Sequence, residues 1–118
     1  MRQIIEEQIL PLVVKPIRYQ GNEYNAVHKN WEDCAVRMVF AFPDLYEVGM
    51  SHLGLQILYG LVNDQPDLLM ERTFAPWVDM EKLLREKGLP LFSLESYRPV
   101  RDFDFMGFTL QYEMSFTN

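Results

Sequence analysis

The chain has 118 residues, of which 48% are hydrophobic and 14% aromatic, and its formal net charge is -6. This composition predicts one folded globular domain and excludes a disordered chain. The acidic balance disfavours nucleic-acid binding, which needs a basic surface, and the apolar runs are too short to span a bilayer. The acids Glu6 and Glu7 stand where a signal peptide would have its apolar centre. We therefore expect a cytoplasmic protein that binds neither nucleic acid nor membranes.

Residues 1–34 are predicted to form a short helix and an arm that wraps the rest of the chain. The first ten residues suit an amphipathic helix. Its apolar face is formed by Ile4, Ile5, Ile9 and Leu10. A polar, turn-rich segment follows and contains Lys15 and Arg18, which we expect to anchor the arm. Cys34 is the single cysteine and excludes an internal disulfide, and the adjacent Glu32 and Asp33 disfavour a reactive thiolate.

Residues 35–118 are predicted to form an α/β domain that starts with a strand, a loop and a helix. Residues 35–42 are almost all apolar, which is typical of a strand buried on both faces. A helix over residues 51–63 has a wide apolar surface, so we expect it to be covered on two sides. We expect its main face to comprise Leu53, Ile57, Leu58, Leu61 and Val62, extended by Leu55 and Tyr59.

The second half continues the alternation of strands and helices. We expect a strand over residues 69–74, in which Glu71 and Arg72 indicate a more exposed position. A helix over residues 76–87 follows and ends at Gly88, and further strands are expected over residues 91–94 and 105–110. This order predicts a mainly parallel, Rossmann-like sheet with flanking helices. Since no covering helix follows the last strand, we expect the domain to be incomplete and the chain to be part of a longer protein.

The loop between the first strand and the first helix of the domain is the predicted site, because ligands of parallel sheets bind at the carboxyl ends of strands. It contains Asp44, Tyr46, Glu47 and His52. These groups allow a metal site formed by Asp44, Glu47 and His52, acid–base catalysis by His52, or cofactor binding by the loop. Neither a G-x-G-x-x-G nor a G-x-x-x-x-G-K-[ST] motif occurs, which disfavours dinucleotides and nucleoside triphosphates.

The same loop resembles that of cobalamin-binding domains. The sequence Asp44-Leu45-Tyr46-Glu47-Val48-Gly49 fits their D-x-H-x-x-G frame except that Tyr46 replaces the cobalt-ligating histidine. Residues 42–54, with further stretches spread over residues 15–118, resemble a subfamily of cobalamin-binding-domain radical S-adenosylmethionine (radical SAM) proteins. Those further stretches lie at residues 15–19, 71–77, 91–96 and 110–113.

The resemblance implies a truncated cobalamin-binding-like domain at the N-terminus of a radical SAM enzyme. It implies cofactor-binding roles for Asp44, Tyr46, Glu47, Gly49, Ser51, His52 and Thr109. Cobalamin is implied for the intact protein but is not expected in the present chain. The 4Fe–4S cluster and S-adenosylmethionine are implied for a downstream domain, because one cysteine cannot hold such a cluster.

The function expected from the resemblance is that of an accessory domain without catalytic or metal-binding residues of its own. Its expected partner is the downstream radical SAM domain of the same polypeptide, and the uncovered sheet is expected to make the isolated chain self-associate. The alternative is a cofactor-free structural or protein-interaction domain. In that case the loop after the first strand would be only a turn.

Overall fold

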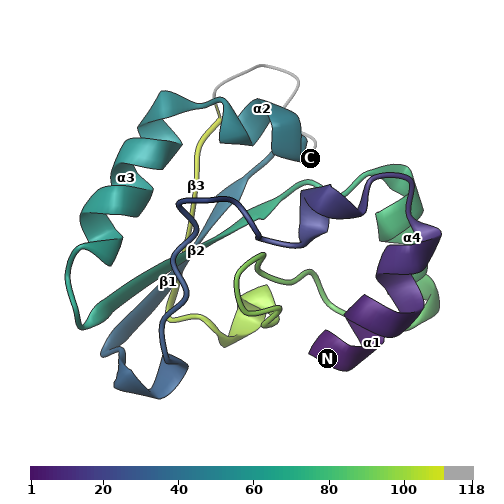
Figure 1. Cartoon of the computed structure of the whole chain (residues 1–118), viewed down its shortest axis with the longest axis horizontal. Coiled ribbons are helices and arrows are strands. Elements are labelled where there is room, and N and C mark those ends of the chain that lie inside the picture. The colour runs from purple at the N-terminus through teal and green to yellow at the C-terminus, as the bar shows by residue number, and fades with distance from the viewer. Residues whose placement is uncertain (111–118) are drawn as a thin grey trace.

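The computed structural model describes residues 1–110 of the chain and shows an α/β fold (Figure 1). A three-stranded sheet has the order β2-β1-β3. The strands are β1 (Val36–Phe42), β2 (Leu68–Phe74) and β3 (Phe105–Phe108), and both pairings are parallel. The predicted parallel, Rossmann-like arrangement is therefore confirmed.

The helix α3 (Leu53–Asn63) packs on one face of the sheet, but not through the surface that the sequence indicates. The residues that face the sheet are Leu55, Tyr59 and Asn63, which recur every four positions. They form a core with Phe40, Phe42, Met70 and Phe74. Four residues of the expected main face are instead exposed: Leu53, Ile57, Leu58 and Leu61. We call these four residues the α3 ridge.

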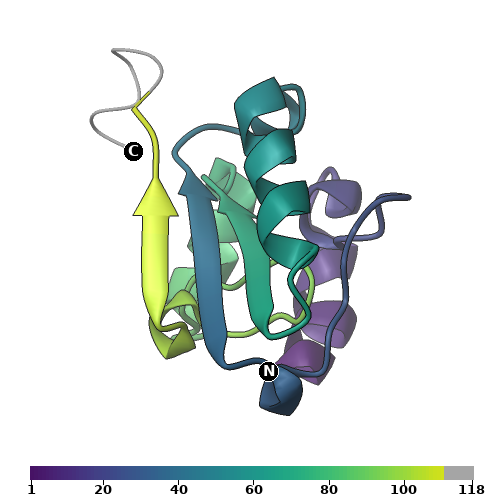
Figure 2. The same cartoon turned by 90° about the vertical axis from the view of Figure 1, so that its left-hand side faces the viewer.

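The opposite face of the sheet is covered by the long connection from β2 to β3. This connection contains α4 (Val78–Glu86) and a 3-10 turn (Val100–Asp102), and Figure 2 shows α4 behind the strands while α3 lies in front. Gly88 follows α4 with a φ of 63°, and the Leu89 amide donates to the Leu84 carbonyl at 2.9 Å. The left-handed conformation explains the glycine at this helix end.

The N-terminal residues form a second, smaller core with α4. The chain begins with α1 (Arg2–Ile4), one π-helical turn (Ile5–Ile9) and one 3-10 turn (Leu10–Leu12). Further 3-10 turns lie at Pro16–Tyr19 and Trp31–Asp33. Ile5 and Ile9 are fully buried, with Met80 and Leu84 of α4 in the same cluster. This cluster attaches the N-terminal segment to the connection between β2 and β3.

The strand expected over residues 91–94 does not form, and only an isolated bridge joins Phe92 to Pro99. The segment instead runs along the outer edge of β2. The Leu94 amide donates to the Arg72 carbonyl at 2.9 Å, but the Arg72 amide donates to the Glu95 carboxylate, also at 2.9 Å. Because a side chain takes the place of the next backbone acceptor, a regular ladder cannot continue.

The expectation that Glu71 and Arg72 lie in an exposed strand is also wrong, since both side chains are buried. Adjacent strand residues point to opposite faces, so each charge has its own partners. The Glu71 carboxylate accepts hydrogen bonds from the Ser93 and Ser96 hydroxyls, both at 2.6 Å. Arg72 lies on the α3 side of the sheet. Within residues 1–110, no helix is long and apolar enough to cross a membrane.

Candidate functional site

The loop after β1 lies at the carboxyl edge of the sheet, as predicted. Asp44 holds this loop through hydrogen bonds at both ends: its carboxylate accepts from the Leu45 amide at 2.7 Å, and its carbonyl accepts from the Ala75 amide at 2.9 Å. The second bond joins the loop after β1 to the loop after β2. In this structure Asp44 thus acts as a turn residue.

Tyr46 begins the short helix α2 (Tyr46–Met50), and its hydroxyl is bound to the N-terminal arm. The hydroxyl donates to Glu23 Oε1 at 2.6 Å, and the ring packs edge-on against Phe74 with centroids 5.6 Å apart. The pKa of Tyr46 is raised above its ordinary value, mainly by burial and also by the hydrogen bond to the Glu23 carboxylate. The phenol is therefore neutral and engaged away from the carboxyl edge.

Glu47 of α2 and Ser51, which directly follows α2, are exposed, and both are engaged within the chain. Arg18 Nε donates to Glu47 Oε1 at 2.8 Å, and Lys15 Nζ lies 3.8 Å from the same oxygen. The hydrogen bond from Arg18 holds the pKa of Glu47 below its usual value. The Ser51 hydroxyl donates to the Glu47 carbonyl at 2.9 Å. The predicted anchoring of the arm by Lys15 and Arg18 therefore occurs on α2.

Gly49 and His52 have clear structural roles in this loop. A Cβ at Gly49 would overlap the Phe74 ring, so the glycine lets α2 pack onto the end of β2. His52 Nδ1 accepts a hydrogen bond from the Leu55 amide at 3.1 Å and so caps the start of α3. A Cβ at Gly54 would lie 2.9 Å from the His52 ring, so this second glycine makes room for the cap.

A buried polar network, which no sequence pattern predicts, lies beneath the loop. Arg72 Nε donates to Glu95 Oε1 at 2.7 Å, and Arg72 Nη2 donates to Glu23 Oε2 at 3.1 Å. The Tyr59 hydroxyl donates to Glu95 at 3.2 Å and accepts from the Val27 amide at 2.7 Å. The Arg72 guanidinium also lies over the Tyr59 ring, 4.3 Å from its centroid. The network thus joins the arm, β2, α3 and the segment after α4.

The charges of this network depend on burial and on each other. Burial raises the pKa of Glu95 to about 7, against the opposing effect of the Arg72 guanidinium. Burial alone would lower the pKa of Arg72, but the carboxylate of Glu95 raises it above its ordinary value. Arg72 therefore remains charged, and Glu95 completes its ionisation only above neutral pH. Since the side chains of Arg72, Glu95 and Tyr59 are buried and bonded to one another, we interpret this network as fixing the fold.

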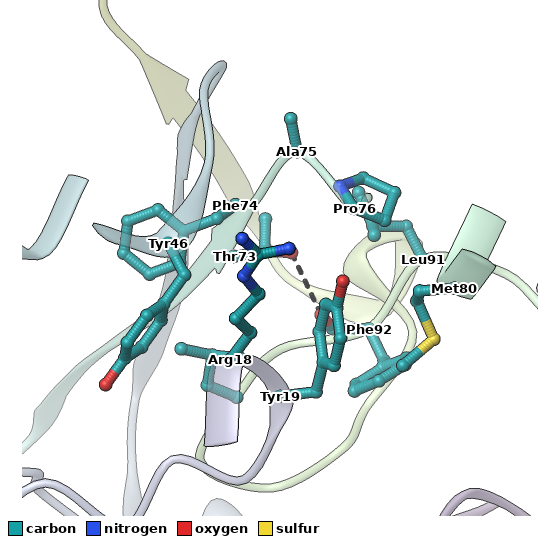
Figure 3. A pocket seen from close by; sticks show the side chains of 11 residues that line it. Arg18, Tyr19, Tyr46, Thr73, Phe74, Ala75, Pro76, Met80, Leu91 and Phe92 are labelled. Atoms are coloured by element: carbon teal, nitrogen blue, oxygen red, sulfur yellow. Dashed lines mark hydrogen bonds between the residues drawn. The ribbon is translucent and has the colours of Figure 1, made fainter. Parts of the chain in front are cut away.

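Two hollows lie near the loop. The first, drawn in Figure 3, lies between Arg18, Tyr19, Phe74 and Pro76, and Tyr46 points its hydroxyl away from it. The volume of this hollow that the centre of a water molecule can occupy is about 10 Å³, so it has room for one water molecule. The second is an open groove of about 420 Å³ on the face opposite α3. This carboxyl-edge groove is lined by Ala41, Phe42, Pro43, Thr73, Phe74, Ala75, Pro76, Leu91, Met106, Phe108 and Leu110.

The predicted residues are thus only partly brought together. Asp44, Tyr46, Glu47, Gly49, Ser51 and His52 lie in one loop and its two helix starts. Thr109 directly follows β3 and is half-buried, between the groove residues Phe108 and Leu110. Across residues 1–110, no three His, Cys, Asp or Glu side chains are grouped so that they could hold a metal ion.

Comparison with known proteins identifies the family. The family model described as radical SAM proteins, N-terminal, matches residues 54–118, which is more than half of the chain. The chain belongs to this radical SAM N-terminal family. No curated protein sequence and no solved structure matches it.

The match places α3, β2, α4 and β3 within the radical SAM N-terminal family, but it begins at Gly54. The match therefore supports the prediction that the chain is the N-terminal part of a radical SAM protein. The loop that carries the cobalamin-like frame lies before the matched residues. For this domain the iron–sulfur cluster of radical SAM chemistry does not fit, because Cys34 is the single cysteine and is buried.

Proposed function

We propose that this domain is the non-catalytic accessory domain of a radical SAM enzyme and that it packs against the catalytic domain of the same polypeptide through the α3 ridge. Membership of the radical SAM N-terminal family supports the accessory role. The α3 ridge carries the proposal for the contact. Four large apolar side chains gathered on one side of a helix are typical of an interaction surface.

The polar groups of the loop support a structural role for the domain. Tyr46, Glu47 and His52 each bond to another part of the chain, to Glu23, to Arg18 and to the start of α3. A catalytic loop needs acids, bases or nucleophiles directed at a space that a substrate can enter. Their arrangement here instead fixes the arm and α3, and so holds the α3 ridge in a defined orientation.

The contact is tested with the substitution Leu53→Glu and the matched control Val78→Glu. Both residues are the first of a helix, and both are apolar and exposed, at 71% and 67%. In the isolated domain neither change should lower the melting temperature, because an acid at a helix start is favourable by about 0.3–1 kcal/mol.

In the whole protein the two variants should behave differently. Leu53→Glu should lower the melting temperature by several degrees and slow the cleavage of S-adenosylmethionine, because it introduces a charge into a buried contact. Val78→Glu should change neither quantity. If Leu53→Glu also leaves both unchanged in the whole protein, the α3 ridge is not the contact with the catalytic domain.

A second candidate function is cobalamin binding at the carboxyl edge of the sheet. It is favoured by the position of the Asp44–Gly49 frame beside the carboxyl-edge groove. The residue at the cobalt-ligating position does not fit, however, since Tyr46 is a neutral phenol already bonded to Glu23. If cobalamin binds here, Tyr46 would therefore not be a ligand of its cobalt.

Cobalamin binding is tested by mixing the domain with hydroxocobalamin, desalting the mixture and recording the visible spectrum. A domain whose role is to pack against the catalytic domain needs no cofactor, so we expect no corrin absorbance to be retained by the isolated domain or by the whole protein. Retained absorbance in the whole protein, unchanged by Tyr46→Phe, would instead favour a cobalamin-binding domain whose cobalt has no ligand from this loop.

A further inference from the structure

Strand β3 has features of a central strand although it lies at the edge of the sheet that residues 1–110 form. It pairs with β1 on one side, and its residues Phe105, Met106 and Phe108 are large, apolar and exposed. Natural edge strands are usually protected by charged residues, proline or bulges. The sequence Phe-Met-Gly-Phe of β3 has no charge and no proline. Strands of parallel sheets are normally buried on both faces.

The register shows which side of β3 each exposed residue occupies. Met106 pairs with Val39 and Phe108 with Ala41. In parallel strands, paired residues point to the same face, so Met106 and Phe108 lie on the face opposite α3. There they line the carboxyl-edge groove, together with Leu110 and with Leu91 from the connection between β2 and β3. The groove is thus a gap beside the part of this face that the connection covers.

From these observations we infer that, in the whole protein, a fourth parallel strand pairs with β3 and that the helix before that strand fills the carboxyl-edge groove. In the strand order β2-β1-β3 the connection from β2 to β3 has to pass β1, and the bonds from Ser93 and Ser96 to Glu71 of β2 place this connection on the face opposite α3. Crossovers between parallel strands are almost always right-handed. If a fourth strand lies beyond β3, the connection from β3 to it runs in the same direction along the sheet as the connection from β2 to β3. The helix of that connection therefore lies on the same face, opposite α3.

This inference rests on the proposed function only in its requirement for a longer polypeptide, and it assigns a different surface. The α3 ridge and the carboxyl-edge groove lie on opposite faces of the sheet. The first is proposed to contact the catalytic domain, and the second to receive the next helix of the same sheet. Substitutions in the two surfaces can therefore fail independently.

The test is Phe108→Glu, with Val78→Glu as the control, in the isolated domain and in the whole protein. At a low concentration, where the isolated domain is monomeric, Phe108 is exposed, so Phe108→Glu should leave the melting temperature unchanged. Light scattering should show that the unsubstituted isolated domain self-associates through the uncovered β3 and that Phe108→Glu reduces this association. In the whole protein Phe108→Glu should lower the melting temperature by several degrees, since a charge then enters a packed site.

Several outcomes would overturn the inference. An unchanged melting temperature of the whole protein with Phe108→Glu would show that the groove is not filled there. Dissociation of a dimer of the whole protein by the same change, without loss of monomer stability, would assign β3 to a second copy of the chain. Retention of hydroxocobalamin by the unsubstituted isolated domain, and its loss with Phe108→Glu, would assign the groove to a cofactor.

Discussion

The buried ion pair between Arg72 and Glu95 allows a direct test of what stabilises this domain, because the chain contains a second pair of almost the same length. Arg72 Nε lies 2.7 Å from Glu95 Oε1, and Arg18 Nε lies 2.8 Å from Glu47 Oε1. The two side chains are 0% and 1% exposed in the first pair but 12% and 47% in the second. Distance is thus held nearly constant while burial differs.

The expected energies follow from the local dielectric. Two charges about 4 Å apart attract by roughly 4 kcal/mol at an effective dielectric constant of 20 and by roughly 1 kcal/mol in water. Double-mutant cycles with Arg→Met and Glu→Gln should therefore give about 2–4 kcal/mol for Arg72 with Glu95. They should give about 0–1 kcal/mol for Arg18 with Glu47.

The assay is urea unfolding of the isolated domain at pH 8, followed by circular dichroism. At this pH Glu95 is ionised in the folded state, since its pKa is about 7. Each cycle uses the unsubstituted chain, two single variants and the double variant. Equal coupling energies for the two pairs would refute the reasoning, because they would show that burial does not decide the strength of these ion pairs.

The remaining predictions concern single residues. Gly49→Ala should destabilise the domain by about 1–3 kcal/mol in the same assay, because the added methyl group overlaps Phe74. Gly60→Ala should instead stabilise the domain by up to about 1 kcal/mol, because a Cβ at this position has no other atom within 4 Å. His52→Ala should cost about 1 kcal/mol through loss of the α3 cap, and an unchanged midpoint would contradict that role. The folded state raises the pKa of Glu95 from 4.5 to about 7. The resulting stability is fully present below pH 4.5 and is lost as the pH rises to 7, by up to about 3 kcal/mol, in the unsubstituted chain but not in Glu95→Gln.

The sequence alone predicts the elements with strong local patterns. The apolar run before Pro43 predicts β1, and the helical pattern that stops at Gly88 predicts α4. Both signals lie within a few neighbouring residues, so they can be read from the sequence. The alternation of strands and helices also predicts the parallel sheet. The sheet-facing side of α3 is not predictable in this way. Its apolar surface is wider than one stripe, so the pattern does not distinguish Leu55 and Tyr59 from the α3 ridge.

The candidate site is less predictable because its contacts join distant parts of the chain. The partner of Tyr46 is Glu23, and the partners of Arg72 are Glu23 and Glu95. No periodic pattern indicates such pairs. One signal was present: an acid and a base stand side by side within the apolar sequence Leu-Leu-Met-Glu-Arg-Thr-Phe of β2. In a strand these two side chains face opposite ways, so each requires a partner of its own.

The most direct test of the proposed role is hydroxyl-radical footprinting of the isolated domain and of the whole protein, with oxidation measured at each residue by mass spectrometry. We predict that Leu53 and Leu58 of the α3 ridge react readily in the isolated domain and become protected in the whole protein. Val78, which lies outside the proposed contact, should react equally in both. Equal reactivity of the α3 ridge in the two proteins would contradict the proposal that this surface packs against the catalytic domain.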